Sequence, residues 1–190
     1  MPPPAAHGGR RRSHTQLAKE GCFINGSRVL LSERLTQRVV RNEIDLLDQS
    51  LVFWIKARLN GDSNKLLHLM DWRSSLYRLQ PGFKWKGIRS CNLAVWRQDF
   101  FAVNGFDETF EGWGHEDADL VLRLSHLGVQ RMNGFWATEV YHLWHREQQR
   151  GQASGNQQKV FARMKTHHIT AEKGLSQIEP HASGKVSNLY

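Results

Sequence analysis

Apolar residues recur at helical spacing in two stretches of this chain. The first predicts an amphipathic helix over residues 43–59, with an apolar face made of Ile44, Leu47, Leu51, Trp54, Ile55 and Leu59. The second predicts a helix over residues 116–127, with Leu120, Val121, Leu124 and Leu127 on one face and Gly128 as its C-cap. Shorter helices are expected at 13–20, at 34–40 behind an N-cap at Ser32, at 97–103 and at 157–165.

Short apolar runs between these helices predict strands at 22–24, 28–31, 90–96, 129–132 and 138–143. Asn25-Gly26 separates the first two runs and is typical of a hairpin turn, so we expect those strands to pair with each other. Residues 61–63 are expected to cap a further short helix through Met70, and residues 71–87 to form a long loop. Strands mixed with helices predict an α/β fold.

The 190 residues are enough for one domain or for part of a larger protein. We expect a disordered start over 1–12, a main domain over 13–150, a helical extension over 151–175 that begins with a flexible link, and a flexible tail over 176–190. The longest apolar runs are too short for a transmembrane helix, and the first ten residues do not resemble a secretory signal.

The chain carries a formal net charge of +8. A solvated basic surface accounts for this charge, and so does attraction to a polyanion such as a nucleotide diphosphate, an anionic membrane or nucleic acid. Nucleic acid is the least favoured partner, because no recognisable nucleic-acid motif accompanies the charge. Cys22 and Cys91 lie far apart and form no paired motif, which fits a reducing compartment and a cytoplasmic location.

Residues 104–119 hold the most informative side chains. Glu116, Asp117 and Asp119 follow an indole, Trp113, which lies between two glycines. Acids in the first turn of a helix are commonly capping residues, because they complement the helix dipole. The functional interpretation is a sugar site, in which the indole offers a flat surface and one carboxylate takes a proton from an attacking hydroxyl.

The strand expected at 138–143 directs His142 to one side and the following His145 to the other. His142 is a candidate imidazole ligand, although a lone histidine is more often a core residue. No full metal set follows from the spacing, and Mn²⁺ would need oxygen ligands from elsewhere. Cys91 and Asn92 either begin an ordinary strand or form one wall of a cleft.

Four motifs follow one another in the second half of the chain: Ser90-Cys91-Asn92-Leu93-Ala94, Arg97-Gln98-Asp99-Phe100, Asn104-Gly105-Phe106-Asp107 and Gly112-Trp113-Gly114-His115-Glu116-Asp117-Ala118-Asp119. Together they resemble the C-terminal, galactosyltransferase-like half of bacterial family-two glycosyltransferases. The resemblance implies the C-terminal portion of a GT-A fold, a mixed sheet with flanking helices, a nucleotide-sugar donor, Mn²⁺ or Mg²⁺, and inversion at the anomeric carbon. The family's nucleotide-binding half and its Asp-x-Asp motif have no counterpart before Gly21, so we expect a truncated form.

The resemblance also implies roles for single residues. Asp117 matches the catalytic base, and Glu116 matches the neighbouring acid that binds sugar hydroxyls. The expected substrate-binding residues are Trp113, Gly114, Cys91, Asn92 and Asp119, and the expected cation ligand is His142, with His145 as the alternative. Ala118 departs from the pattern of Golgi β-galactosyltransferases, which have an acceptor-binding Asp there, so acceptor recognition is expected to differ.

The predicted activity is transfer of a sugar from a nucleotide-sugar donor to a glycan or lipid-linked acceptor, in bacterial surface polysaccharide or lipopolysaccharide synthesis. We also expect the protein to make a peripheral contact with the inner face of the plasma membrane. One alternative is a non-catalytic remnant that keeps carbohydrate binding. The least favoured alternative is a basic nucleic-acid-binding module.

Overall fold

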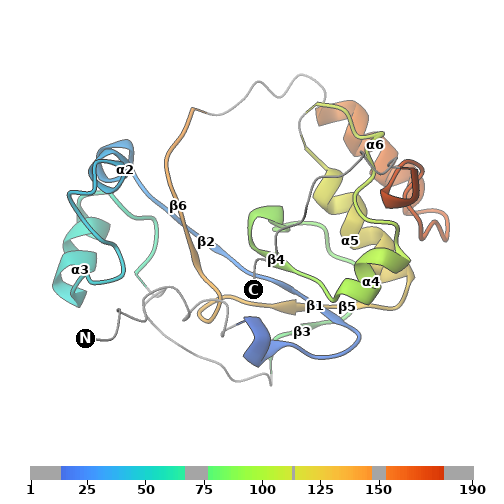
Figure 1. Cartoon of the computed structure of the whole chain (residues 1–190), viewed down its shortest axis with the longest axis horizontal. Coiled ribbons are helices and arrows are strands. Elements are labelled where there is room, and N and C mark those ends of the chain that lie inside the picture. Colours follow the sequence, from blue (N-terminus) through green and yellow to red (C-terminus); the bar gives the residue numbers. More distant parts are fainter. Residues whose placement is uncertain (1–13, 67–76, 113, 147–152, 178–190) are drawn as a thin grey trace, which may run out of the picture. The chain divides into compact units, whose positions relative to one another are not determined.

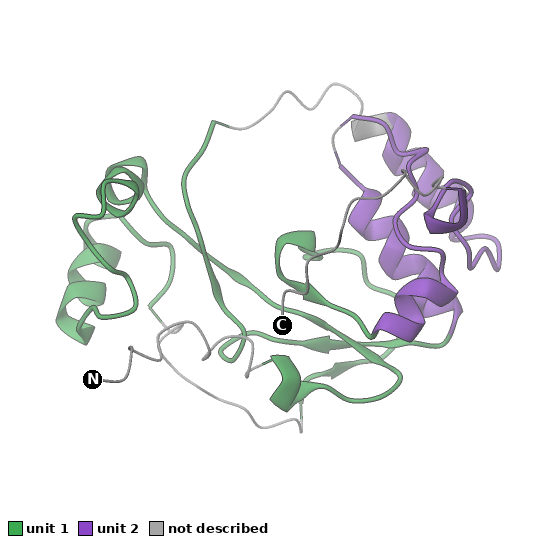
Figure 2. Cartoon of the chain, in the orientation of Figure 1, with its two compact units in different colours: residues 1–96, 128–149 green, residues 97–127, 150–190 purple. Residues whose placement is uncertain are grey.

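The computed structural model describes residues 14–66, 77–112, 114–146 and 153–177. The chain divides into two compact units (Figure 2), and each unit consists of two stretches that are separate in sequence. Unit 1 contains residues 1–96 and 128–149, and unit 2 contains residues 97–127 and 150–190. This division interleaves the units along the chain, whereas the domains expected from the sequence were consecutive.

Unit 1 holds all strands of the described residues (Figure 1). Its larger sheet has the strand order β3-β5-β1-β4, formed by β1 (Cys22–Asn25), β3 (Leu79–Gln80), β4 (Leu93–Ala94) and β5 (Gln130–Asn133). β1 pairs in parallel with β5 and antiparallel with β4, and β3 pairs antiparallel with β5. The sheet is therefore mixed, and together with the helices it confirms the predicted α/β fold class.

The hairpin predicted around Asn25-Gly26 is wrong. β2 (Arg28–Leu30) pairs in parallel with β6 (Val140–His142) and not with β1. The N–H of Gly26 donates to the carbonyl of Asn92 at 2.8 Å, so this connection is bonded to a distant segment. A Cβ at Gly26 would lie 2.1 Å from Nδ2 of Asn92, and close approach therefore explains the glycine better than turn geometry does.

Two helices of unit 1 begin behind serine caps. α2 (Glu33–Val40) starts as predicted, because Oγ of Ser32 accepts the N–H of Leu35 at 3.1 Å. The helix predicted over 43–59 is wrong in its first half, since α3 (Leu51–Leu59) begins behind its own N-cap, Ser50. Asp45 accepts the N–H of Leu47 at 2.8 Å through its side chain, and such local bonds compete with helical ones.

Helices α2 and α3 share an apolar cluster with β2. The buried members are Val29, Leu31, Leu35, Leu46, Trp54 and Ala57. Trp54 also stacks on Tyr141 of β6, with 5.2 Å between ring centres. A second cluster, formed by Leu17, Cys22, Ile24 and Met132, lies against the larger sheet.

Unit 2 is built on helices in its described residues: α4 (Arg97–Ala102), α5 (Glu116–His126), α6 (Ala153–Arg163) and the 3-10 turn η3 (Leu175–Gln177). α4 and α5 lie where they were predicted, and Gly105 and Gly128 beyond them have positive φ values of 72° and 91°. The flexible link predicted to run through residue 156 is wrong from Ala153 onward, because α6 begins there.

Other predictions are confirmed in part or lie outside the described residues. The strand predicted over 90–96 is shortened to β4, which follows the 3-10 turn η2 (Ser90–Asn92). The loop predicted over 71–87 contains β3, and its first six residues are not described. The end of the short helix predicted through Met70 is likewise outside the described residues. Within the described ranges, none of the helices combines the length and the apolar character needed to cross a bilayer.

Candidate functional site

The predicted acid pair lies in the first turn of α5, in unit 2. Glu116 and Asp117 are its first two residues, and both are half-buried. The loop that leads to them has left-handed backbone at Gly112, Gly114 and the N-cap His115, with φ values of 78°, 93° and 73°. The helix dipole favours negative charge at this end, so the position suits a carboxylate that must stay ionised to accept a proton. Trp113 falls outside the described residues.

Asn156 of α6 fastens the loop that leads into α5. Its Nδ2 donates to the carbonyls of Glu111 at 3.1 Å and Gly114 at 2.9 Å, on either side of position 113. Asn156 is buried, on the same face of α6 as Val160 and Arg163. Sequence reasoning missed this residue, although the i, i+4, i+7 spacing of these three side chains was a usable signal.

Replacing Asn156 by Asp should loosen this loop. The change keeps the side-chain shape but removes both donors, and each lost hydrogen bond is worth about 1 kcal/mol. We expect amide hydrogen exchange over residues 108–116 to become at least tenfold faster. Gln158→Glu makes the same chemical change at an exposed position of α6 and should leave the exchange unaltered. Equal exchange in the two variants would contradict the anchoring role.

A buried charge network joins α5, α6 and the loop after α4. Arg163 lies 2.6 Å from Asp119, 2.8 Å from Asp107 and 2.7 Å from Glu172. Burial alone would raise the pKa of Asp107, but backbone N–H groups of Thr109 and Glu172 and the guanidinium of Arg163 hold it well below its usual range. These acids are therefore structural in unit 2, and sequence reasoning had singled out neither Arg163 nor this use of Asp107.

The Asn104-Gly105-Phe106-Asp107 motif also has a structural role. Oδ1 of Asn104 accepts the N–H of Ser176 at 2.8 Å, and Asp107 accepts the N–H of Glu172 at 3.0 Å. A Cβ at Gly105 would lie 2.8 Å from Cγ of Leu175. The motif therefore holds residues 171–177 against the loop that follows α4.

Asp119 was predicted to bind substrate, but the structure gives it a structural role. Its side chain is fully buried, with Oδ2 bound by Nε of Arg123 at 2.8 Å and Oδ1 bound by Arg163. Both carboxylate oxygens are taken by guanidinium groups, which leaves no surface for a sugar hydroxyl. The correction has a simple cause: two residues along a helix turn the side chain by about 200°, so Asp117 and Asp119 face different surroundings.

In unit 1, Cys91 and Asn92 have different surroundings although they are adjacent. Cys91 carries an exposed thiol. Asn92 is buried, its Nδ2 donates to the carbonyls of Ser27 and Thr138, and its Oδ1 lies 3.0 Å from Nε2 of His14. The structure thus uses Asn92 to join three chain segments, and this differs from the predicted contact with substrate.

His142 ends β6, and its ring centre lies 5.1 Å from that of His145. Burial, and the positive charges of Arg28 and His145, lower the pKa of His142. A lowered pKa favours the neutral imidazole, which is the form that binds metal ions. Among the described residues, no three or more His, Cys, Asp or Glu side chains come together as a metal site. His142 and His145 lie side by side, and the described residues bring no further ligand of these types to them.

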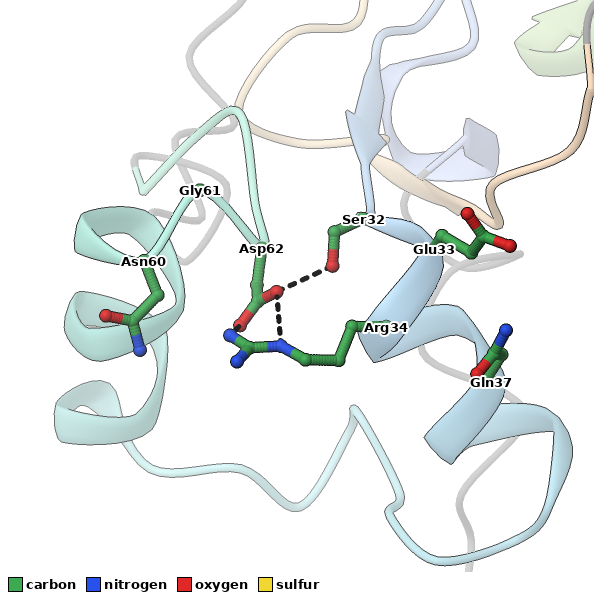
Figure 3. A pocket seen from close by; sticks show the side chains of 7 residues that line it. All are labelled: Ser32, Glu33, Arg34, Gln37, Asn60, Gly61 and Asp62. Carbon is green, nitrogen blue, oxygen red and sulfur yellow. Dashed lines mark hydrogen bonds and ion pairs between the residues drawn. The ribbon is translucent and has the colours of Figure 1, made fainter.

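A polar hollow of about 710 Å³ lies between α2 and the end of α3, in unit 1 (Figure 3). It is lined by Ser32, Glu33, Arg34, Gln37, Asn60, Gly61 and Asp62. Asp62 accepts from Oγ of Ser32 at 2.6 Å and pairs with Arg34, so the charges of these two residues offset each other. None of the predicted site residues lines this hollow.

Comparison with known proteins finds a family similarity in the middle of the chain. The family described as "N-terminal domain of galactosyltransferase" matches residues 72–146, which include all four of the motifs above and both histidines. This description differs from the C-terminal position that the motif resemblance implied. No solved structure matches the chain.

Individual relatives agree with this class. Beta-1,4-galactosyltransferase 4 of Homo sapiens is 42% identical over 66 residues, which cover 34% of this chain and 17% of the relative. The proteins of the same name from Rattus norvegicus and Cricetulus griseus are each 43% identical over 65 residues. The aligned part thus spans about a sixth of the length of these curated relatives. The chain is similar to a galactosyltransferase domain over this region.

Proposed function

We propose that this chain is part of a glycosyltransferase that moves a sugar, with galactose as the first candidate, from a nucleotide-sugar donor to a glycan or lipid-linked hydroxyl. The observation that carries the proposal is the galactosyltransferase match over residues 72–146. The position of Asp117 in the first turn of α5, behind a loop anchored by Asn156, supports it.

The proposed chemistry uses the residues of α5. Asp117 accepts the proton of the acceptor hydroxyl as its oxygen forms a bond to the anomeric carbon. The bond from that carbon to the diphosphate breaks on the opposite face, the electron pair leaves with the nucleotide diphosphate, and the configuration inverts. Glu116, next to Asp117, holds the sugar hydroxyls by hydrogen bonds. A positioned base of this kind accelerates a reaction about 10²–10⁴-fold.

The setting of this reaction is proposed from the motif resemblance and the charge of the chain. We place it at the inner face of a bacterial plasma membrane, in surface polysaccharide or lipopolysaccharide synthesis. The relatives named above are mammalian, so their names do not support the bacterial setting. The net charge of +8 fits a nucleotide diphosphate and an anionic membrane as partners.

A donor screen tests the proposal. The 190-residue chain, and a form extended upstream in its own reading frame, are incubated with uridine diphosphate sugars, a glycan acceptor and Mn²⁺. We expect the extended form to release nucleotide in an acceptor-dependent way and to give a product of inverted anomeric configuration by NMR. Sugar binding without turnover in both forms would identify a non-catalytic remnant and overturn the proposal. Tight binding to DNA or RNA that weakens steeply with salt would point to the nucleic-acid alternative.

Cation binding by His142 is a separate expectation. His142→Ala should weaken Mn²⁺ binding, measured by calorimetry on the protein with nucleotide diphosphate present, by about tenfold or more. Binding to the wild-type protein should also weaken as the pH falls, at a lower pH than for an ordinary imidazole, because protonation of His142, whose pKa is lowered, then competes with the ion. His145→Ala is the paired variant that separates the two candidates. Unchanged Mn²⁺ binding in both variants would remove this pair from the metal site.

A further inference from the structure

α3 presents an apolar face to solvent. Its inner side places Trp54 and Ala57 in the core, where they are 1% and 4% exposed. Its outer side carries Leu51, Val52, Ile55 and Leu59, which are 59%, 60%, 39% and 80% exposed. Single exposed apolar residues are ordinary, but four on one short helix form a contiguous patch of the kind that marks an interaction surface.

The charges of α3 border this patch. At about 100° per residue, the four apolar side chains fall within an arc of about 100°, with Arg58 close to one border and Lys56 close to the other. Both cations are exposed, and the helix contains no acidic residue. Long basic side chains at the edges of an apolar stripe can lie along it and place their charges at the level of lipid phosphates.

The charged residues that precede α3 in the sequence are not on the helix, so they do not form part of the border of its apolar stripe. Arg38 and Arg41 of the preceding segment each lie 3.8 Å from Glu43, whose one carboxylate offsets one of their two positive charges. Asp45 and Asp48 precede the N-cap of α3 and add negative charge before its first turn. The positive charge offered beside the apolar stripe therefore comes from Lys56 and Arg58.

We propose that α3 is a membrane-docking surface, which lies in the headgroup region of an anionic bilayer with Leu51, Val52, Ile55 and Leu59 inserted and with Lys56 and Arg58 at the phosphates. The chemistry of the partner follows from the surface, because an apolar stripe bordered by cations complements acyl chains bordered by anionic headgroups. This inference rests on the membrane location proposed above and needs neither a sugar donor nor turnover.

Vesicle flotation of the 190-residue chain tests this surface. We expect binding to vesicles of phosphatidylcholine with 30% phosphatidylglycerol, and at least tenfold weaker partition for the double variant Val52→Glu, Leu59→Glu, since each change replaces an inserted side chain by a charge. Both positions are exposed, so the fold should be retained, which circular dichroism checks. Met164→Glu is a control for added charge, because it places one new carboxylate on an exposed apolar residue of unit 2.

A second pair of variants separates the charge from the apolar stripe. Lys56→Gln with Arg58→Gln should lower binding to anionic vesicles about tenfold and leave the weak binding to pure phosphatidylcholine unchanged. Wild-type binding that does not depend on anionic lipid, or equal binding of the Val52, Leu59 double variant, would overturn the proposal. So would concentration-dependent self-association without lipid that the same double variant abolishes, since a second copy would then cover the stripe. Failure here with a successful donor screen would leave the proposed glycosyl transfer standing.

Discussion

Replacing Asp119 by Ala should destabilise the protein by about 3–5 kcal/mol, because it leaves buried guanidinium charges without a counter-ion. Asp119 and Arg123 are both fully buried, and Arg163 is 8% exposed at its side chain. Glu172 and Asp107 still contact Arg163 in the variant, but Arg123 loses the carboxylate that it binds. Urea unfolding followed by circular dichroism measures the change.

The control for Asp119 is an exposed ion pair in the same unit. Lys173 and Glu108 lie 3.2 Å apart and are 61% and 49% exposed, so Lys173→Ala should cost less than about 1 kcal/mol. The double variant Asp119→Leu, Arg123→Met should recover part of the loss, since it removes both charges together and fills the space with apolar atoms. A cost for Asp119→Ala as small as that of Lys173→Ala would show that the buried network does not stabilise unit 2.

Asp117→Asn should reduce turnover about 10²–10⁴-fold in whichever form the donor screen finds active, because an amide cannot accept the proton of the acceptor hydroxyl. The two side chains have nearly the same shape, so we expect the free energy of unfolding to change by less than about 1 kcal/mol. The fall should be in kcat rather than in donor binding, since the base acts in the chemical step. Initial rates and donor titration by calorimetry separate the two effects.

Glu108→Gln is the matched control for Asp117→Asn. It also converts an acid to its neutral amide, at an exposed position in the same unit. It should leave turnover within about twofold. If Asp117→Asn kept wild-type rates, Asp117 would not be the base, and its role would be that of an acid at a helix N-terminus that complements the helix dipole. A loss of turnover that came with a loss of stability would likewise count against a role as base.

The start and end of several helices could be read from the sequence. Ser32 caps α2, and α4 ends before Asn104-Gly105 as predicted. These features depend on a few consecutive residues, since a serine hydroxyl bonds an N–H three positions away and a glycine accepts positive φ. The regular apolar pattern of α5 likewise identified that helix, and Leu120, Val121 and Leu124 are buried as predicted, whereas Leu127 is exposed and burial extends around the helix from Ala118 to Leu124.

The face that α3 buries could not be read from its periodicity. The pattern marked a stripe that ran through Leu51, Ile55 and Leu59, and that stripe exists, but it lies at the surface. The core takes Trp54, which the pattern included, and Ala57, which it did not, because Trp54 stacks on Tyr141, which lies far along the chain. Periodicity shows that one side of a helix is apolar and does not show what that side contacts.

In the candidate site too, the sequence determined some features and the tertiary structure decided others. The sequence alone determined that acids follow a glycine-flanked indole at a helix start, and that similarity to a galactosyltransferase domain makes sugar transfer the leading function. Only the tertiary structure decided that Asp119 and Asn92 are buried in structural contacts, that β2 pairs with β6, and that Asn156 holds the loop before Asp117. The reason is physical: caps and helical patterns arise between near neighbours in sequence, whereas burial, strand pairing and ion-pair partners depend on residues that only folding brings together.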